Sequence, residues 1–489
     1  MDNYGLLSLL PPLVAIVLCV TTKQLVLSLF AGSFVGALVL CGGNPVAAFV
    51  TAIQHASATV ANSSNANILV FTLALGGYIG LMGKSGGMQA LVNRTIHLVS
   101  TRMRGQLAAC ILSILLFFDD YTSIILSGVI TRPLTDKLHV SREKLSYIVD
   151  SCGAGVAATS PVSNWTAYEV GVIGSVLVTI GLTDSAYMTF LQSIPYRFYC
   201  LFSVAFVFMI VCQKRDFGKM YEAEKRAITT GQVSRPGSTP MAGLNEEEYH
   251  APEGLAGIMG KADVIGMMTV GIFVSTFVLG IMMVIQKIMN VTDVVDTWTN
   301  GMKSVFFTIV FIVLAWMVSS FCKELGTANF VVGALVAANF PAWILPTAVF
   351  IIAGIMAFAT GSSWGTMALV LPLAMPAAVG LGAPFSAVLG GVLTGATLGD
   401  HISPISESVV MSSMSSSCDH LDHVTTQLPY ALTVCAISIV CGFIPAGLGV
   451  PVSISLLAGL AATFLVVRIV GKPCNEKAFN VEIVKAESK

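Results

Sequence analysis

The stretch Phe117–Ser123 (FFDDYTS) decides the fold, because it sets two adjacent carboxylates between long apolar runs. A second polar stretch in the same half of the chain, Ser160–Asn164 (SPVSN), interrupts another apolar tract. The other half of the chain has a matching pair of stretches, Gly361–Thr366 (GSSWGT) and Ser403–Glu407 (SPISE). Paired polar breaks in an otherwise apolar chain point to a secondary transporter, and they mark the position of its binding site.

A constant offset relates the two halves of the chain. When Ser160 is aligned with Ser403, the offset is 243 residues (403 − 160). The same offset, without a gap, sets the acidic pair that begins at Asp119 on the serine pair that begins at Ser362. Because one register joins separate landmarks, the sequence predicts an internal duplication.

The composition is that of a membrane protein. Hydrophobic residues make up 55% of the 489 residues and charged residues only 10%, against about 25% charged residues in a typical soluble domain. Residues 24–83, 325–399 and 424–467 contain no Asp, Glu, Lys or Arg. About 20 apolar residues cross a bilayer as a helix, so each tract holds two or more crossings or re-entrant pieces. We expect an all-α polytopic protein with 10 to 13 crossings, and the net charge of −1 argues against nucleic acid as a partner.

The chain divides at a long polar loop that is rich in Lys and Arg and contains the flexible sequence SRPGS. The positive-inside rule makes this loop cytoplasmic. The expected division is 1–65, N-terminal transmembrane helices; 66–212, first transmembrane repeat; 213–262, cytoplasmic linker; 263–447, second repeat with a preceding helix; 448–489, last transmembrane helix and cytoplasmic tail.

The two adjacent acids are the first candidates for an ion site. An ionised carboxylate in the middle of a membrane helix costs on the order of 2.5–3.5 kcal/mol. Asp119 and Asp120 therefore line an aqueous cavity, bind a cation or remain protonated, and a carboxylate in such a place can take either Na⁺ or H⁺. The alternative is a helix end at the membrane surface, where the acids cap the helix.

The Ser-Pro-x-Ser stretches provide oxygen ligands by a different route. Proline has no N–H to donate and displaces the carbonyl four residues earlier, and unwound backbone at membrane depth is tolerated where it lines a cavity. Freed carbonyls and serine hydroxyls suit a small hard cation. The candidate ion- and proton-binding residues are Asp119, Asp120, Asp400, Glu407, Ser160, Ser163, Asn164, Ser403 and Ser406, with Na⁺ expected at Asp119, Asp120 and Glu407.

The second hairpin stretch also fits the G-x-S-x-G motif of hydrolases. That motif needs a strand–turn–helix setting, whereas this one lies inside a charge-free apolar tract, so we interpret it as a hairpin tip of small residues and not as part of an enzyme. The candidate substrate-binding residues beside the breaks are Thr122, Ser123, Trp165, Ser362, Ser363, Trp364 and Thr366.

Other polar residues have plainer interpretations. The 11 cysteines are scattered singly, which favours small core residues over a disulfide framework. The sequence CDHLDH at Cys418–His423 resembles a metal cluster, but a helix start with local hydrogen bonds is the favoured reading. We expect Asp150, Glu169 and Asp184 to be edge or loop residues, and nothing in the sequence calls for a cofactor.

Long motifs resemble a known family. FFDDY with RPLTDK and SREKLSYIVD in the first half, and GSSWGTMA with LGDHISPISES and CDHLDHVTTQLPYAL in the second, are similar to NhaC-type sodium/proton antiporters of the ion-transporter superfamily. The resemblance implies inverted repeats, each with a re-entrant hairpin and an interrupted helix, often in a homodimer that works by an elevator motion. It departs at Glu407, where the family usually has Asp.

The resemblance implies Na⁺/H⁺ antiport across the cytoplasmic membrane of a bacterium by alternating access. The partners are then Na⁺, H⁺, the lipid bilayer and a second copy of the chain. The alternative is Na⁺-coupled transport of a small organic solute, such as an amino acid or a hydroxy acid. Trp165, Tyr168 and Trp364 beside the breaks suit an organic solute at least as well as a bare ion.

Overall fold

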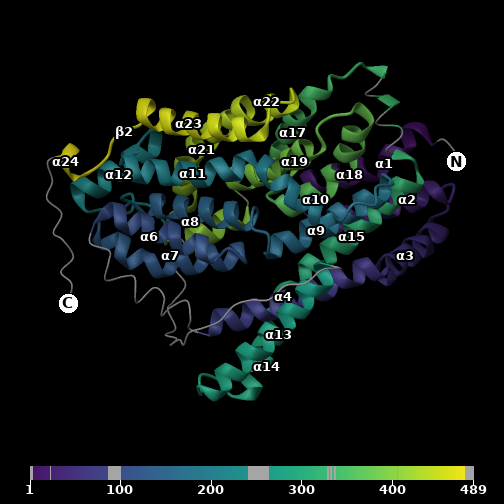
Figure 1. Ribbon diagram of the computed structural model, residues 1–489, viewed down its shortest axis with the longest axis horizontal. Helices are drawn as coiled ribbons and strands as arrows, with labels where there is room; N and C mark the ends of the chain where they lie inside the picture. Colours follow the sequence, from purple (N-terminus) through teal and green to yellow (C-terminus); the bar gives the residue numbers. More distant parts are fainter. Residues whose placement is uncertain are drawn as a thin grey trace.

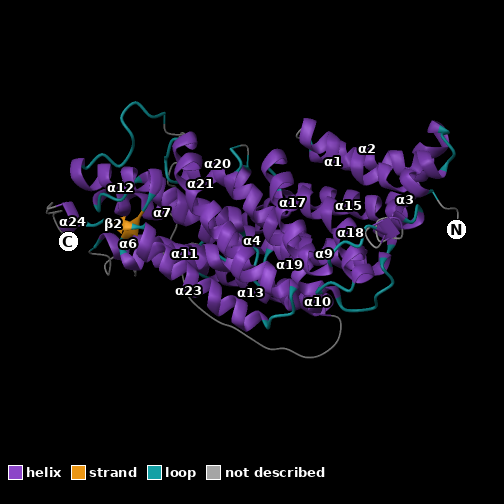
Figure 2. Cartoon of the chain, turned by 90° about the horizontal axis from the view of Figure 1, so that it is seen from above, coloured by secondary structure: helices purple, strands orange, loops and turns teal. Residues whose placement is uncertain are grey.

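The computed structural model describes residues 4–22, 24–85, 101–239, 264–327, 330, 333–334, 337–404 and 406–479. These residues form an elongated assembly of helices, with α1 (Leu10–Thr22) and α24 (Glu476–Phe479) toward opposite ends of the long axis (Figure 1). The strands described are two residues long each and pair near the C-terminus, where β1 (Arg215–Asp216) runs antiparallel to β2 (Lys472–Pro473) (Figure 2). The expectation of a mostly helical membrane protein with broken helices is confirmed.

The helices of the first half precede the linker. They are α1 (Leu10–Thr22, after a 3₁₀ turn at Gly5–Leu9), α2 (Leu25–Leu40), α3 (Pro45–Ala61), α4 (Ser63–Lys84), α6 (Arg102–Leu115), α7 (Asp120–Lys137), α8 (Arg142–Ala157), α9 (Asn164–Thr179), α10 (Ala186–Ser193, followed by a 3₁₀ turn at Ile194–Tyr196), α11 (Phe198–Gln213) and α12 (Gly218–Thr230).

The helices of the second half follow the linker. They are α13 (Val264–Ile285), α14 (Val291–Ser304), α15 (Phe306–Glu324), α17 (Leu345–Thr360, after a 3₁₀ turn at Ala342–Ile344), α18 (Ser363–Leu381), α19 (Phe385–Ile402), α20 (Glu407–Ser415), α21 (His420–Ile437), a π-helical turn (Ser438–Phe443), α22 (Ile444–Gly447), α23 (Val452–Val470) and α24 (Glu476–Phe479).

Five pairs of helices begin in the same register. The first residues of α4 and α15, of α6 and α17, of α7 and α18, of α8 and α19 and of α9 and α20 are each 243 residues apart. Polar N-caps fix at least five of these ten starts, since a side-chain oxygen that accepts a bond from the first-turn backbone stabilises a helix beginning. The caps include Thr101 of α6, Asp119 of α7, Ser141 of α8, Ser163 of α9 and Ser362 of α18.

Helices of each half pack against partners in the other half. Helix α4 packs on α13 and α14, while its counterpart α15 packs on α2 and α3. Helix α7 packs on α20, while its counterpart α18 packs on α9. The α6–α7 hairpin lies toward the end of the molecule that carries α12, and the α17–α18 hairpin lies toward the end that carries α1 (Figure 1). The two hairpins therefore approach the middle from opposite ends.

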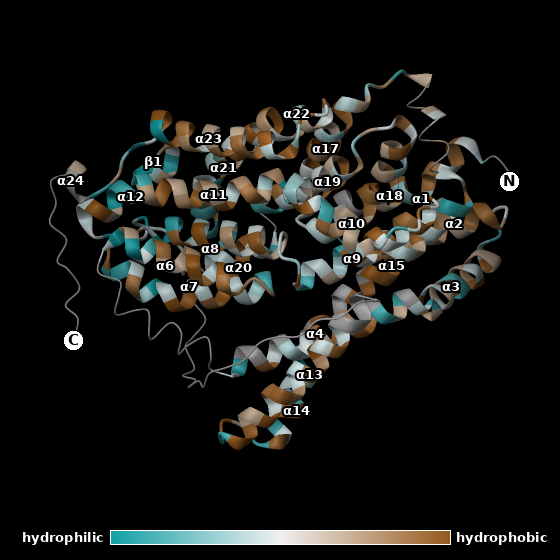
Figure 3. Ribbon diagram, viewed as in Figure 1, coloured by the Kyte–Doolittle hydropathy of each residue, from teal (hydrophilic) through white to brown (hydrophobic). Residues whose placement is uncertain are grey.

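The outer surface is suited to lipid. Hydrophobic residues colour most of the helices, and hydrophilic ones gather at the end that carries α12 and β1 (Figure 3). Within the described residues, four helices are long and apolar enough to cross a membrane: Ala342–Thr360, Ser363–Leu381, His420–Gly447 and Val452–Val470. Two bent pairs, α2 with α3 and α10 with α11, raise this number to six. The expected total of 10 to 13 crossings stays a prediction.

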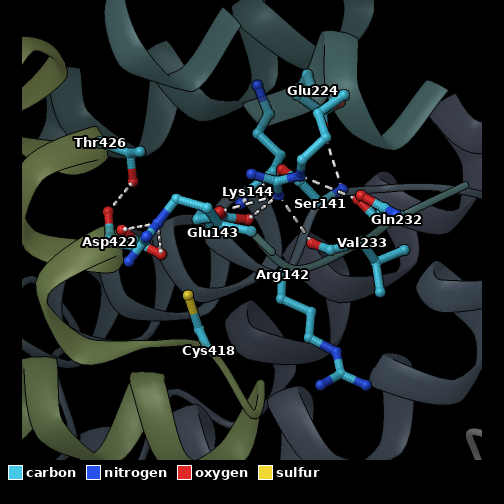
Figure 4. A network of polar contacts seen from close by, with 12 residues as sticks. Ser141, Arg142, Glu143, Lys144, Glu224, Gln232, Val233, Cys418, Asp422 and Thr426 are labelled. Atoms are coloured by element: carbon cyan, nitrogen blue, oxygen red, sulfur yellow. Dashed lines mark hydrogen bonds and ion pairs between the residues drawn. The ribbon is translucent and has the colours of Figure 1, made fainter. Parts of the chain in front are cut away.

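The described part of the linker covers the hydrophilic end (Figure 4). Arg226 of α12 forms a 2.9 Å ion pair with Glu143 at the start of α8 and donates to the carbonyls of Gln232 and Val233. Residues 231–239 continue across the start of α21, and the rest of the predicted linker, 240–262, lies outside the described residues. This segment therefore ties α8, α12 and α21 together.

Two expectations for single acids are wrong. Asp150 and Glu169 lie in the interior, at 0% and 1% exposure, and not at an edge or in a loop. Each has a basic partner far away in sequence: His423 at 3.7 Å for Asp150, and Arg197 at 2.7 Å for Glu169. Asp184 does lie in a loop, as expected.

The helix-start reading of the CDHLDH sequence is confirmed. Asp419 is the N-cap of α21 and accepts hydrogen bonds from the backbone N–H groups of Leu421 and Asp422.

Candidate functional site

The tip of the first hairpin carries the two adjacent acids. Helix α6 ends at Leu115 and α7 begins at Asp120, so the tip is only four residues long. Asp119 is the N-cap of α7, and its Oδ2 accepts from the backbone N–H of Thr122 at 2.8 Å and also from the Thr122 hydroxyl. Asp120 is 1% exposed. The capping role weighed as an alternative is therefore confirmed for Asp119, at a tip where Asp119 is half-buried, Asp120 is buried and Phe117 is exposed.

Asn164 joins this tip to the first broken helix. Its Nδ2 donates to Asp119 Oδ1 at 2.6 Å and to Asp120 Oδ1 at 3.2 Å. Its backbone N–H donates to the carbonyl of Phe118 at 3.0 Å. One amide group therefore holds both carboxylates at the point where α9 begins.

The second broken helix forms a similar polar group around Asp400 in the last turn of α19. Asp400 is 5% exposed, and its two oxygens accept from Ser406 Oγ at 2.7 Å and from Ser408 Oγ at 3.2 Å. Ser408 was not among the predicted residues. The signal for it is the symmetric sequence Ser-Glu-Ser, which places a hydroxyl on each side of Glu407.

Tyr121 joins the two polar groups. Its hydroxyl donates to Glu407 Oε2 at 2.7 Å, and Glu407 lies between the two serines that hold Asp400. Tyr121, which was not among the predicted site residues, thus links carboxylate-bearing segments from the two halves of the chain.

Two of these carboxylates, Asp120 and Asp400, are buried, while Asp119 is half-buried and Glu407 is exposed. Among the residues that the structure describes, no ion pair joins Asp119, Asp120, Asp400 or Glu407 to a basic side chain. Every other buried acid there has a basic partner: Glu143 with Arg226, Asp150 with His423, Glu169 with Arg197, Asp216 with Lys144 and Glu224 with Arg102. A buried carboxylate without a paired charge is unfavourable, so Asp120 and Asp400 are suited to a bound cation or proton.

One further group has the geometry of a metal site. The ligand atoms of Asp216, Glu224 and Cys474 all lie within 4.8 Å of one another. Both carboxylates already face a permanent cation, Lys144 and Arg102 respectively. We therefore interpret this group as a structural network at the linker end and not as the ion site.

The tip of the second hairpin lies against the first broken helix. Gly361 ends α17 with φ of 68°, a left-handed conformation that glycine adopts without strain, and the chain turns directly into α18. The Trp364 ring lies 4.5 Å from the ring of Tyr168 and 5.7 Å from that of Trp165, and the Tyr168 hydroxyl donates to the Trp364 carbonyl at 2.6 Å. The setting is helix–turn–helix and not the strand–turn–helix of a hydrolase.

Several predicted hydroxyls bond to the backbone and shape the breaks. Ser123 donates to Ser113 O at 2.8 Å, and Ser403 donates to Phe358 O at 2.9 Å. The other hydroxyls of this kind are Ser160 to Val162 O, Ser163 to Ala157 O and Thr366 to Ser362 O. The structure thus places Asp119, Asp120 and Asn164 in one hydrogen-bonded group and Asp400, Ser406 and Ser408 in another, and the Tyr121–Glu407 bond joins the helices that carry them. The hydroxyls that bond to the backbone shape the breaks around these groups.

Solved structures of similar fold are transporters. The fold is similar to that of MtrF of Neisseria gonorrhoeae, described as one of a class of antimetabolite efflux pumps, with a TM-score of 0.53 and 12% identity over 89% of this chain and 86% of that chain. It is also similar to the YdaH transporter of Alcanivorax borkumensis, with a TM-score of 0.55 and 14% identity over 83% of this chain and 89% of that chain. At these identities the likeness concerns the fold alone.

Proteins similar in sequence indicate the class of transporter. An uncharacterized protein of Haemophilus influenzae is 33% identical over 93% of each chain. The malate-2H(+)/Na(+)-lactate antiporter of Bacillus subtilis is 39% identical over 20% of this chain and 22% of that one. The sequence model of the Na⁺/H⁺ antiporter family matches residues 160–447, which include both broken helices. The chain is therefore a multi-pass membrane protein and a secondary transporter, and it belongs to the Na⁺/H⁺ antiporter family.

Proposed function

We propose that the protein exchanges Na⁺ for H⁺ across a bacterial inner membrane by alternating access. The observation that carries this proposal is the pair of buried carboxylates without a basic partner, Asp120 and Asp400, in an interior where every other described buried acid has one. Carboxylates, hydroxyls and carbonyls are hard oxygen ligands that suit small cations. The same carboxylates take up protons when the cation leaves, and this competition couples the two ions.

Each group has a defined role in this proposal. Asp119, Asp120 and Glu407 bind Na⁺ as substrate, and Asp400 completes the charge of the site. Asn164 and Tyr121 hold the carboxylates in position through the hydrogen bonds described above. Carbonyls at the broken ends of α8 and α19 supply neutral ligands, as half-helix ends do in other secondary transporters.

Two inverted transmembrane repeats are part of the same proposal. The shared helix register supports a duplication, with residues 66–212 and 263–447 as the two transmembrane repeats. The reciprocal packing of α7 with α20 and α18 with α9, together with hairpins from opposite ends, supports an inverted relation between them. Inverted repeats around a central site are the usual frame for alternating access, and a homodimer with an elevator motion completes the proposal by family resemblance.

Na⁺-coupled transport of a small organic solute is the second candidate. The aromatic group of Trp165, Tyr168 and Trp364 lies beside the first break and provides flat apolar surfaces that a bare ion does not need. The Bacillus subtilis relative is named for organic acids as well as for Na⁺ and H⁺. In this case the same carboxylates hold Na⁺ as the coupling ion.

Transport in sealed proteoliposomes separates the two candidates. Vesicles with a trapped pH dye receive a pulse of Na⁺ alone, and parallel vesicles receive Na⁺ with labelled amino or hydroxy acids. Proton movement on Na⁺ alone supports antiport. No proton movement on Na⁺ alone, with Na⁺-dependent uptake of one labelled solute, contradicts antiport and favours the second candidate.

A further inference from the structure

A second polar cluster lies outside the carboxylate site, between α8 and α21. Asp150 Oδ2 is 3.7 Å from His423 Nε2, and both side chains are 0% exposed. Gln427, one turn along α21 from His423, donates from Nε2 to Asp150 Oδ2 at 2.7 Å and to the carbonyl of His401 at 2.6 Å. His423 Nε2 also lies 3.2 Å from Ser412 Oγ. The cluster therefore joins α8, α19, α20 and α21.

The cluster has polar capacity that no described neighbour uses. The atoms without a hydrogen-bond partner are Asp150 Oδ1, His423 Nδ1, Gln427 Oε1 and His401 Nε2. All four side chains are at most 1% exposed. Buried polar atoms are nearly always paired with protein or ordered water, so a concentration of unpaired ones marks a place that holds water or an exchangeable proton.

The choice of base distinguishes this cluster from the other buried ion pairs. Elsewhere the partner of a buried acid is Arg or Lys, as in the 2.7 Å pair of Glu169 with Arg197. A guanidinium does not lose its proton in a protein. Histidine is the side chain that gains and loses a proton near neutral pH. An acid–histidine pair can therefore change its charge by one unit, which an acid–arginine pair cannot.

The groups that face the pair include few other titratable side chains. His401 and Asp400 face it from α19, and Tyr199 faces it from α11, where its hydroxyl lies 3.3 Å from His401 Nδ1. Tyr147 comes from α8 itself and has no partner at its hydroxyl. Among the described residues, no Lys or Arg forms an ion pair with Asp150, and His423 is its basic partner.

We propose that Asp150 and His423 form a second proton-binding site, separate from the four carboxylates, that binds and releases one H⁺ in each transport cycle. The inference rests on the proposed Na⁺/H⁺ exchange. It adds a further transported proton, bound by the Asp150–His423 pair, which Na⁺ does not displace directly. The chemistry is one proton transfer: an N–H bond forms on the imidazole when H⁺ enters and breaks when H⁺ leaves, with no electron transfer.

The position of the pair gives this proton a route. His423 lies in the first turn of α21, whose N-cap Asp419 accepts from the Thr239 backbone at 2.9 Å. The start of α8 is bound to α12 through Glu143, and Figure 4 shows these contacts at the linker end. On the other side, His401 follows Asp400 directly in the chain. The pair thus lies between the linker end and the carboxylate site.

The test measures the number of protons moved for each Na⁺ in the same proteoliposomes, with ²²Na⁺ and a trapped pH dye. The double variant Asp150→Asn with His423→Gln removes both charges together, because a single removal leaves one buried charge unpaired. His423→Lys is the second variant, since it keeps a cation beside Asp150, as Lys144 does beside Asp216. His55→Gln on α3, far from the pair in sequence, is the matched control.

The proposal expects a lower H⁺/Na⁺ ratio in the double variant and in His423→Lys, and an unchanged ratio in His55→Gln. A merely structural pair lowers both fluxes together, so a ratio equal to that of the unmodified protein in both variants overturns the proposal.

Acid–base titration of the purified protein is independent of transport. One fewer titrating proton in the double variant supports the site even if Na⁺ moves no protons in vesicles, a result that contradicts the proposed antiport alone. An unchanged proton count overturns the site.

Discussion

The hydroxyl of Tyr121 donates a 2.7 Å hydrogen bond to the Glu407 carboxylate, across 286 positions of sequence. Tyr121 belongs to the first turn of α7, and Glu407 is the first residue of α20. This bond joins the tip of one half's hairpin to the broken helix of the other half. A movement of either segment therefore changes the position of the Glu407 carboxylate relative to Tyr121. Alternating access requires a coupling of this kind between the two halves.

Tyr121→Phe removes this bond and leaves the ring in place. Hydrogen bonds to charged groups contribute about 1.5–3 kcal/mol, so we expect the Na⁺ concentration for half-maximal transport to rise about tenfold or more. Concentration series in proteoliposomes measure this change. Tyr221→Phe on α12, at the linker end, is the control, and equal values for the two variants contradict the role given to Tyr121.

Asp119→Asn and Asp120→Asn are expected to abolish transport without unfolding the protein. Asparagine is as good an N-cap as aspartate, so Asp119→Asn keeps the start of α7 while it removes a charge. Thermal unfolding in detergent and Na⁺-driven flux are measured on the same preparation. Asp296→Asn, an exposed acid on α14, is the control, and normal flux in both site variants shows that the ion site lies elsewhere.

Ser408→Ala tests a residue that the structure adds to the site. Its hydroxyl donates to Asp400 at 3.2 Å, and loss of a hydrogen bond to a buried group weakens the arrangement by about 1–3 kcal/mol. We expect a higher Na⁺ requirement with an unchanged amount of folded protein. Ser175→Ala on α9, whose hydroxyl bonds within its own helix, should transport normally. A Ser408→Ala protein with normal Na⁺ dependence removes Ser408 from the site.

The linker contacts should differ in their effect on stability. Arg226 and Glu143 are mostly buried, at 18% and 3% side-chain exposure, and loss of one partner of a buried pair destabilises a protein by about 3 kcal/mol. Arg226→Ala should therefore lower the unfolding temperature measurably. Arg235 is half exposed in its pair with Asp422, so Arg235→Ala should leave the unfolding temperature unchanged. The reverse order of the two variants contradicts this view of the linker.

The broken helices could be predicted from the sequence, and the carboxylates beside them could be named as candidates. Prolines and adjacent acids in an apolar tract are local signals, and a constant offset of 243 residues relates the two halves of the chain. The structure has broken helices at the positions that these features mark. Asp119, Asp120, Asp400 and Glu407 were all found in this way, because a carboxylate in an apolar tract is conspicuous.

The contacts that join distant segments were not predictable from local pattern. Asp150 lies in a helix of mixed polarity, and no nearby residue indicates that His423 is its partner. The His423 imidazole approaches Asp150 only after the two halves of the chain have packed. Glu169 and Arg197 likewise meet through helix packing, within the first half of the chain. Hydrophobic periodicity identifies the helices and their breaks, but which side chains become partners depends on how the helices pack.

The central claim is that Na⁺ and H⁺ compete for the four carboxylates, and proton release on Na⁺ binding tests it most directly. Purified protein in weakly buffered solution with a pH dye is titrated with Na⁺, beside the Asp120→Asn variant and with choline as the control cation. The account predicts that Na⁺ releases protons from the unmodified protein, that Asp120→Asn releases fewer, and that choline releases none. Na⁺ that binds with no proton release, or with the same release from Asp120→Asn, would contradict it.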